Sequence, residues 1–207
     1  MLAHILDNPA IKAKVEAEAR EGPFKDMPAA DGTYDAEDET LPYIRACMKE
    51  VLRMYISILT HRRVTRDVPI TTSAGATYRL QGGDMLSVAS YVRHYDERIY
   101  ADPHVFRPER WLDGTTYPED HWFPFSKGRY SCSGQHLAKL EMPLLTALLF
   151  RRFDMELLGP LPAADWSEVV ASVRPVGWPE EDILRMRYTA RAGHSGVGGF
   201  AGGGSEI

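Results

Sequence analysis

One segment of the chain carries residues whose types and spacing could do chemistry: residues 125–141, with the sequence FSKGRYSCSGQHLAKLE. It holds Cys132, one of only two cysteines, between Gly128 and Gly134. A helix-forming run follows the cysteine, and unpaired N–H groups at a helix N-terminus stabilise a thiolate over a thiol. Flanking glycines leave room for a flat ligand to approach the backbone. The segment therefore predicts one axial sulfur ligand beneath a planar macrocycle, and the alternative is that Cys132 is a buried core thiol.

These residues resemble the haem loop of the cytochrome P-450 haem-thiolate enzymes. Four positions match the phenylalanine, first glycine, cysteine and second glycine of that loop in order: Phe125, Gly128, Cys132 and Gly134. Three more match the common start of the helix that follows: Leu137, Ala138 and Glu141. The resemblance implies a haem b cofactor whose iron takes Cys132 as its axial thiolate ligand. It also implies that Phe125, Gly128 and Gly134 bind the cofactor.

The loop departs from the family pattern at Tyr130, where the family most often has a basic residue that meets a haem propionate. Here the arginine stands one residue earlier, at Arg129. A tyrosine hydroxyl donates a neutral hydrogen bond, about half as strong as a charge-assisted one. Arg129 is long enough to reach a propionate from its shifted position. Arg62 is a second candidate because its charge is permanent, and a solvent-facing Arg62 is the alternative.

An upstream pair of charges extends the resemblance. Glu50 and Arg53 stand three residues apart in LPYIRACMKEVLR, close enough to pair on one helix. Such a pair is usually a surface feature of little energetic weight. The segment is similar to helix K of the family, and FRPERW downstream supplies Arg110. The resemblance implies a buried triad of Glu50, Arg53 and Arg110 that locks the core supporting the haem.

The segment after Arg53 is similar to the one that lines the substrate cavity in the family. It supplies three candidate substrate contacts: Ile58, Leu59 and Thr60. The family usually has prolines close after the arginine, whereas this chain has ISI at residues 56–58. The conformation of this turn is therefore left open.

Capping signals and hydrophobic periodicity indicate where the first helices lie. One helix ends near Asp7, and a second begins near Pro9 with Asn8 as its N-cap. A third begins at Pro42, which is tolerated in a first turn. Five residues of this helix recur at helical spacing and form an apolar stripe that assigns Cys47 to the core: Ile44, Cys47, Met48, Val51 and Tyr55.

The elements around the cysteine segment complete the pattern. A helix should run from about residue 134 to residue 150, with Pro143 expected to kink it. Five leucines are expected to be buried along it: Leu137, Leu140, Leu144, Leu145 and Leu148. Alternating residues over 68–88 predict short antiparallel strands. Residues 177–187 resemble the hairpin that closes the family's fold.

Composition limits the function classes. With 44% hydrophobic and 26% charged residues, the chain has the composition of a soluble globular protein. A net charge of −5 argues against nucleic acid as a general partner. Two cysteines in unrelated contexts give no disulfide framework and fit a reducing compartment. No run approaches the roughly 18 apolar residues of a membrane span, and the first residues lack a signal-peptide pattern.

We therefore expect a mostly α-helical fold with small antiparallel β-sheets, the C-terminal haem-binding part of the cytochrome P-450 fold and incomplete. Residues 1–190 would form this portion, and the glycine-rich residues 191–207 would be disordered. The first residues resemble the close of the family's long central helix, so the proton-delivering part of that helix would be absent. For a full-length relative the resemblance implies the cytosolic face of the endoplasmic reticulum membrane, although this chain itself shows no anchor.

The implied activity is monooxygenation of a small lipophilic substrate, with electrons supplied from NADPH by a flavoprotein reductase. Five basic residues oppose Glu141 between residues 123 and 152 and give this stretch a charge of +4: Lys127, Arg129, Lys139, Arg151 and Arg152. This basic face near Cys132 is the expected docking surface for the reductase, with a plain solvated face as the alternative. Two other functions stay open: a haem-thiolate isomerase or dehydratase, which needs no reductase, and a truncated product that is not catalytic.

Overall fold

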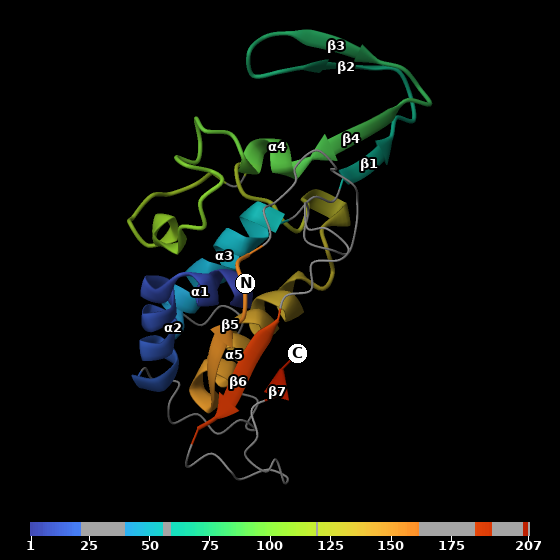
Figure 1. Ribbon diagram of the computed structural model, residues 1–207. Helices are drawn as coiled ribbons and strands as arrows, with labels where there is room; N and C mark the ends of the chain where they lie inside the picture. The colour runs from blue at the N-terminus through green and yellow to red at the C-terminus, as the bar shows by residue number, and fades with distance from the viewer. Residues whose placement is uncertain (22–39, 56–58, 119, 162–184, 192–204, 207) are drawn as a thin grey trace.

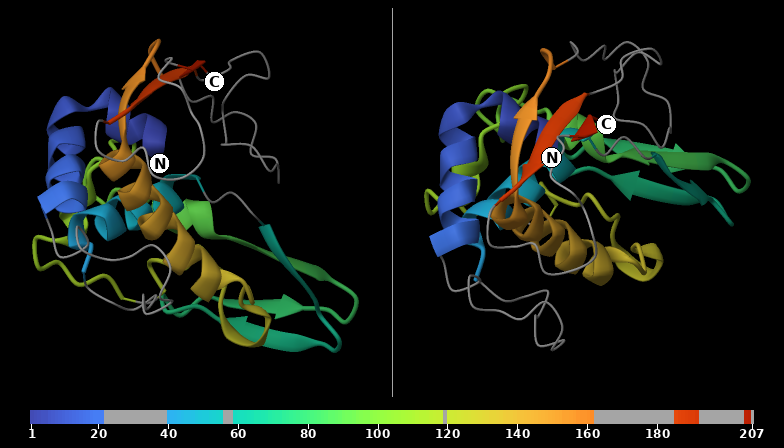
Figure 2. Two further views of the ribbon diagram at one scale, coloured as in Figure 1. Left: turned by 90° about the horizontal axis from the view of Figure 1, so that it is seen from below. Right: turned by 60° about the horizontal axis from the view of Figure 1, so that its bottom comes forward.

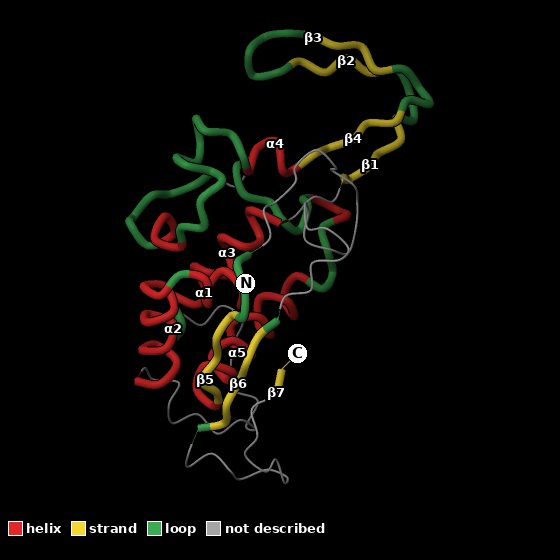
Figure 3. Tube along the Cα trace, in the orientation of Figure 1, coloured by secondary structure: helices red, strands yellow, loops and turns green. Residues whose placement is uncertain are grey.

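The longer helices lie together in one part of the molecule, and a group of strands projects from it (Figure 1). The computed structural model describes residues 1–21, 40–55, 59–118, 120–161, 185–191 and 205–206. Helices α1 (Leu2–Asp7), α2 (Pro9–Glu21), α3 (Pro42–Tyr55) and α5 (Gln135–Arg152) gather into one helical body. Two antiparallel strand pairs extend away from it, as the tube in Figure 3 shows in yellow. The expected mostly helical fold with small antiparallel sheets is confirmed.

The hydrophobic core lies where these four helices meet strand β5 (Phe153–Leu157). Each helix contributes one apolar stripe, as Ile11, Val15 and Ala19 do for α2 at a spacing of four residues. Cys47 is fully buried in the same cluster, as its place on the stripe of α3 predicts. Burial raises the pKa of the Cys47 thiol far above its usual range, so this sulfur behaves as a small apolar group.

The junction between α1 and α2 follows the capping signals in the sequence. The Asn8 side-chain oxygen accepts hydrogen bonds from the backbone N–H groups of Ala10 at 3.1 Å and Ile11 at 3.2 Å. Pro9 is the first residue of α2, where its missing N–H costs no helical hydrogen bond. The predicted N-cap and helix start are both confirmed.

Helix α3 is capped from another helix, which sequence patterns do not show. The Glu18 carboxylate of α2 accepts hydrogen bonds from the backbone N–H groups of Tyr43 at 2.8 Å and Ile44 at 2.7 Å. These N–H groups have no partner within their own helix. Burial raises the pKa of Glu18, although both hydrogen bonds act in the opposite direction. Glu18 therefore joins α2 to the start of α3.

Helix α5 buries a different face from the one expected. Its buried residues are Pro143, Thr146, Ala147 and Phe150. Leu137 and Leu145 are 55% and 56% exposed, so the prediction that they are buried is wrong. The other three leucines of the predicted set are half-buried: Leu140, Leu144 and Leu148. Leucines occur on more than one face of this helix, so periodicity alone does not select the face that meets α2 and α3.

Pro143 lies inside α5, which continues across it as one helix. The proline removes one backbone donor but stands in the buried stripe, where its ring packs instead of meeting solvent. In the next turn Thr146 donates its hydroxyl to the carbonyl of Met142 at 2.7 Å. The proline therefore does not end the helix that follows the cysteine segment.

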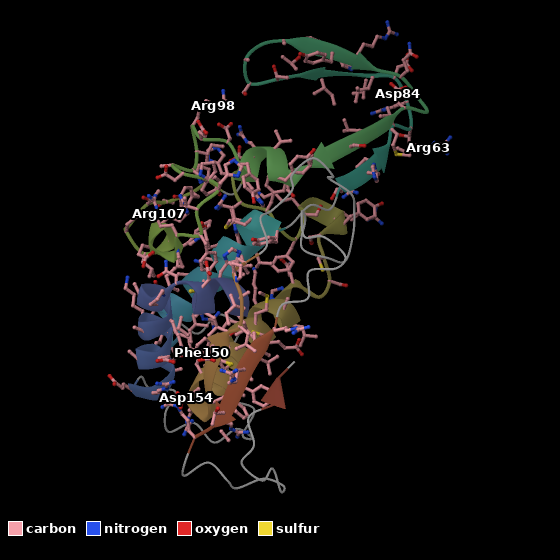
Figure 4. All side chains as sticks on the ribbon, viewed as in Figure 1. Arg63, Asp84, Arg98, Arg107, Phe150 and Asp154 are labelled. Carbon is pink, nitrogen blue, oxygen red and sulfur yellow. The ribbon has the colours of Figure 1, made fainter. Side chains whose placement is uncertain are left out.

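The strands predicted between residues 68 and 88 are present as β2 (Val68–Thr71), β3 (Thr77–Leu80) and β4 (Met85–Ala89), and the structure adds β1 (Leu59–Arg63), which lies outside the predicted range. Strand β1 pairs with β4, and β2 pairs with β3, both antiparallel. Gly75 and Gly83 turn the chain with φ of +83° and +102°, a conformation that L side chains rarely adopt. In Figure 4 side chains crowd around Phe150 in the helical body and are sparser around Arg63 and Asp84 on the strand layer. The strands project from the body with little packed around them.

Short elements and a third sheet complete the described structure. The short elements are helix α4 (Ser90–His94) and the 3-10 helices η2 (Pro108–Trp111) and η3 (Gly128–Tyr130). Strand β5 pairs with β6 (Met186–Ala190), and β6 pairs with β7 (Ser205–Glu206), all antiparallel. The predicted tail of residues 191–207 lies outside the described residues except for Arg191 and β7, so its disorder stays a prediction for the remainder.

We expect Asn8→Ala to lower the free energy of unfolding by about 1 kcal/mol, because two N–H groups of α2 lose their side-chain acceptor. Asn8→Asp is the matched control, since aspartate accepts the same hydrogen bonds. Chemical denaturation followed by circular dichroism measures both. An alanine variant as stable as the aspartate variant would contradict the capping role.

Candidate functional site

The cysteine loop leads from Phe123 into helix α5 and is shaped by backbone hydrogen bonds. Cys132 donates its N–H to the carbonyl of Phe125 at 2.9 Å, which closes the loop on itself. The carbonyl of Cys132 accepts from Gln135 N–H at 3.3 Å, and Gln135 is the first residue of α5. The cysteine side chain is exposed. It therefore stands just before a helix start, free of the hydrophobic core, and the alternative of a buried core thiol is wrong.

The two glycines of the loop have different structural roles. Gly128 has φ of +72°, so a residue with a side chain would be strained there. Gly134 has φ of −84°, and a Cβ placed on it would lie 3.8 Å from the Cys132 sulfur, in ordinary van der Waals contact. The positive φ at position 128 requires glycine. The backbone at position 134 suits any residue, and because Gly134 has no side chain, nothing at that position touches the Cys132 sulfur.

Strand β1 lies beside this loop, although the two are far apart in the sequence (Figures 1 and 2). The Thr60 hydroxyl donates to the Ser126 hydroxyl at 3.4 Å. The Arg62 guanidinium lies 4.8 Å from the centroid of the Tyr130 ring, and the Arg129 guanidinium lies 5.9 Å from the same centroid. The structure thus brings both arginines predicted to meet a propionate to one exposed tyrosine next to the cysteine loop.

The candidate substrate residues are only partly described. Ile58 lies outside the described residues. Leu59 is the first residue of β1, where its backbone pairs with Ala89. Thr60 is half-buried and contacts the cysteine loop. These positions place the segment next to the candidate site, and its contact with a substrate stays a prediction.

The predicted basic face is not one continuous surface. Lys127 and Arg129 are exposed in the cysteine loop, and Lys139 follows in α5, where it lies 5.8 Å from the centroid of the Phe125 ring. Arg151 and Arg152 are in the last turn of the 18-residue helix α5. At 1.5 Å per residue they lie roughly 25 Å along the axis from its first turn. The five basic residues therefore form two separate groups, one near the start of α5 and the other, Arg151 and Arg152, at its end.

A buried charge cluster lies between helix α3 and the 3-10 helix η2. Glu50 and Arg53 come from α3, Arg110 comes from η2, and all three side chains are 0% exposed. Arg53 donates two hydrogen bonds to the Glu50 carboxylate, from Nε at 3.1 Å and from Nη2 at 2.9 Å. Arg110 donates a third from Nε at 3.0 Å. The structure brings together the three charges that the sequence singles out.

Glu50 also receives two donors that sequence reasoning missed. The backbone N–H of Arg107 donates to it at 3.2 Å, and the indole N–H of Trp111 donates at 2.9 Å. Each carboxylate oxygen of Glu50 therefore has at least two donors, which offsets the cost of removing the charge from water. The one sequence signal for these donors is that Trp111 directly follows Arg110, which is already predicted to pair with Glu50.

The cluster has two positive charges for one negative charge, and backbone carbonyls compensate the excess. Arg53 and Arg110 donate to five carbonyl oxygens, at 2.7 to 3.5 Å: those of His94, Ala101, Asp102, Pro103 and Val105. The ring of Tyr100 lies 5.2 Å from the Arg53 guanidinium and 6.0 Å from that of Arg110. The irregular chain between α4 and η2 is thereby fixed around the two arginines.

Comparison with known proteins identifies the family. The family model named cytochrome P-450 matches residues 1–174. The chain belongs to the cytochrome P-450 family.

Several curated fungal members of the family are similar to this chain. N-acetyltryptophan 6-hydroxylase of Emericella nidulans is 32% identical over 163 residues, covering 77% of this chain and 31% of the relative. The cytochrome P-450 monooxygenase asqL of the same organism is 37% identical over 155 residues, with 73% and 32% covered. Fusicoccadiene C-8 hydroxylase of Phomopsis amygdali is 36% identical over 152 residues, with 72% and 28% covered. The chain spans less than a third of the length of these relatives.

The family implies a haem cofactor, and the described residues fit one. Cys132 is exposed ahead of a helix, and no side chain at position 134 crowds its sulfur. The guanidiniums of Arg62 and Arg129 lie near the ring of Tyr130, a residue of the cysteine loop, and offer positive charge to propionates there. Among the described residues, no three His, Cys, Asp or Glu side chains gather into a metal site. No described helix combines the length and apolar character that crossing a membrane requires.

We expect Arg110→Ala to lower the free energy of unfolding by about 3–5 kcal/mol and to prevent stable haem incorporation, because Glu50 loses a buried partner. Arg79→Ala is the matched control. It breaks a 3.2 Å pair with Asp67 in which the two side chains are 76% and 56% exposed. This change should cost at most about 1 kcal/mol. Urea denaturation and haem content per chain measure both variants, and equal losses would show that burial of the pair is unimportant.

Proposed function

We propose that the protein acts as a haem-thiolate monooxygenase, with haem b held by Cys132. The exposed thiol ahead of α5, in a chain of the cytochrome P-450 family, carries this proposal. Haem held by Cys132 would supply the activation of dioxygen for insertion of one oxygen atom into a substrate, and the Cys132 thiolate would donate electron density to the iron.

The chain's own residues divide the remaining tasks. Cys132 binds the iron, and the loop closed by its N–H bond to Phe125 orients the sulfur. Arg62 and Arg129, which both lie near the Tyr130 ring, are proposed to neutralise the haem propionates. Phe125, Gly128 and Gly134 are proposed to contact the cofactor. The Glu50, Arg53 and Arg110 triad takes no part in the chemistry and holds the loop-bearing region in place.

We propose a small lipophilic substrate and an NADPH-dependent flavoprotein reductase as partners. The names of two relatives describe hydroxylation of N-acetyltryptophan and of fusicoccadiene, which are small organic molecules. Ile58, Leu59 and Thr60 are proposed to face the substrate. The reductase would dock against the basic residues nearest the cysteine, Lys127, Arg129 and Lys139, where positive charge steers an acidic partner. The endoplasmic reticulum surface is the proposed location of the whole protein.

A haem-thiolate isomerase or dehydratase stays as a second candidate, because the same cysteine loop would serve it without a reductase. A chain that binds haem without catalysis is the third. Dependence of turnover on NADPH separates the first candidate from the other two.

We expect Cys132→Ser to abolish the strongly red-shifted Soret band that thiolate ligation gives to the reduced, carbon monoxide-bound haem protein. Cys47→Ala is the matched control, since Cys47 is buried in the helical core and its variant should retain the band. Absorption spectra of the three proteins at equal haem content measure the effect. A red-shifted band that persists in Cys132→Ser would contradict the assignment of Cys132 as the haem ligand.

We expect residues 1–207 expressed alone to form no hydroxylated product, whereas a version extended to the length of the relatives turns over. The matched segments of 163, 155 and 152 residues cover less than a third of those relatives, so the enclosure of the haem would be incomplete and activated oxygen would be lost to water. Both proteins are assayed with a reductase and NADPH, by product formation and NADPH consumption. Product formed by the short chain and coupled to NADPH would contradict this expectation.

A further inference from the structure

His94 is a buried titratable residue that connects the charge cluster to the cysteine loop. It is the last residue of α4 and is 0% exposed. Its ring Nδ1 lies 3.1 Å from the carbonyl oxygen of Arg53, and its Nε2 lies 3.2 Å from the backbone nitrogen of Phe123. The His94 carbonyl in turn accepts from Arg53 Nη1 at 2.8 Å. One residue therefore meets Arg53 twice and the start of the loop once.

The two partners of the ring select one protonation state. A carbonyl oxygen can only accept, so Nδ1 must carry the hydrogen that points to Arg53. A backbone N–H can only donate, so Nε2 must present its lone pair to Phe123. The ring is therefore neutral, with its hydrogen on Nδ1. Burial lowers the pKa of His94 to about 4, which agrees with a neutral ring beside the Arg53 guanidinium.

The bond to Phe123 continues into the loop that presents the sulfur. The Phe123 carbonyl accepts from Ser126 N–H at 3.1 Å, and the Phe125 carbonyl accepts from Cys132 N–H at 2.9 Å. The ring of Phe123 also packs edge-on against the His94 ring, with centroids 5.5 Å apart. Hydrogen bonds and the short stretch of chain between them thus lead from the buried triad through His94 to the backbone of Cys132.

We propose that His94 is a positioning residue that fixes the entry of the cysteine loop relative to the Glu50–Arg53–Arg110 cluster, by accepting the Phe123 N–H at Nε2 while donating to Arg53 from Nδ1. Its part in holding Cys132 at a haem iron rests on the proposed function. The linkage of the loop to the cluster does not, because it concerns contacts within this chain alone.

Two amide variants separate the two ends of the ring. In His94→Gln the side-chain oxygen can occupy the place of Nε2 and accept from Phe123. In His94→Asn the shorter amide can occupy the place of Nδ1 and donate to Arg53, but it leaves the Phe123 N–H without an acceptor. Both variants replace an aromatic ring by an amide in the same buried position, so a general loss of packing affects them alike.

Hydrogen exchange at the Phe123 amide, measured by NMR without haem, is the first test. We expect exchange near the wild-type rate in His94→Gln and at least about tenfold faster exchange in His94→Asn, since a lost buried hydrogen bond shifts an opening equilibrium by that order. Equal exchange rates in the two variants would overturn the proposal. This outcome is independent of whether haem binds.

The haem-bound proteins give the second test. We expect His94→Gln to retain the red-shifted Soret band of the reduced, carbon monoxide-bound state and His94→Asn to lose part of it at equal haem content. A full band in His94→Asn would overturn the role toward the haem. If the wild-type protein itself shows no such band, the proposed function fails, and the exchange measurement still decides the linkage.

If both variants unfold, nitrogen NMR of the His94 ring in the wild-type protein still tests the proposal. We expect the His94 Nδ1 signal in the protonated range and the Nε2 signal in the range of a nitrogen without hydrogen, with scalar coupling from Nε2 to the Phe123 amide nitrogen. A hydrogen found on Nε2, or no coupling between those two nitrogens, would overturn the proposal without any variant.

Discussion

The structure depends on one buried carboxylate. Glu50 is fully buried and receives five hydrogen bonds, three of them from the guanidiniums of Arg53 and Arg110. A buried charge is tolerated only where its lone pairs are met, and removing one partner leaves the others stranded. The donors come from α3, from η2 and from the irregular chain before η2. This single carboxylate therefore joins segments that no helix or sheet connects to one another.

The candidate site and the core have opposite environments. Cys47 is enclosed by the helices, whereas Cys132 stands in an exposed loop at the N-terminal end of α5. An exposed sulfur can reach a ligand, but a loop on the surface does not hold a fixed position by packing alone. The hydrogen bonds from Cys132 N–H to the Phe125 carbonyl and from Phe123 N–H to His94 supply that position instead. A rigid buried cluster thus supports an accessible thiol.

Charge has two distinct uses in this chain. In the interior it is paired, satisfied by backbone carbonyls and unavailable to other molecules, as for Arg53 and Arg110. Around the cysteine loop it stays near solvent, where Arg62 and Arg129 lie around the ring of Tyr130. The same residue type therefore provides rigidity in one place and accessible positive charge in the other, and burial decides between them.

The sequence by itself determined the features that depend on local order: the helix starts at Pro9 and Pro42, the turns at Gly75 and Gly83, and the motif around Cys132. Capping, turn and motif signals lie within a few residues of one another, so they can be read along the chain. Only the tertiary structure decided which face of α5 is buried, that the basic residues lie in two groups, and that His94 connects the charge cluster to the loop. These depend on contacts between residues distant in sequence, and no local pattern shows which partner a buried polar atom will meet.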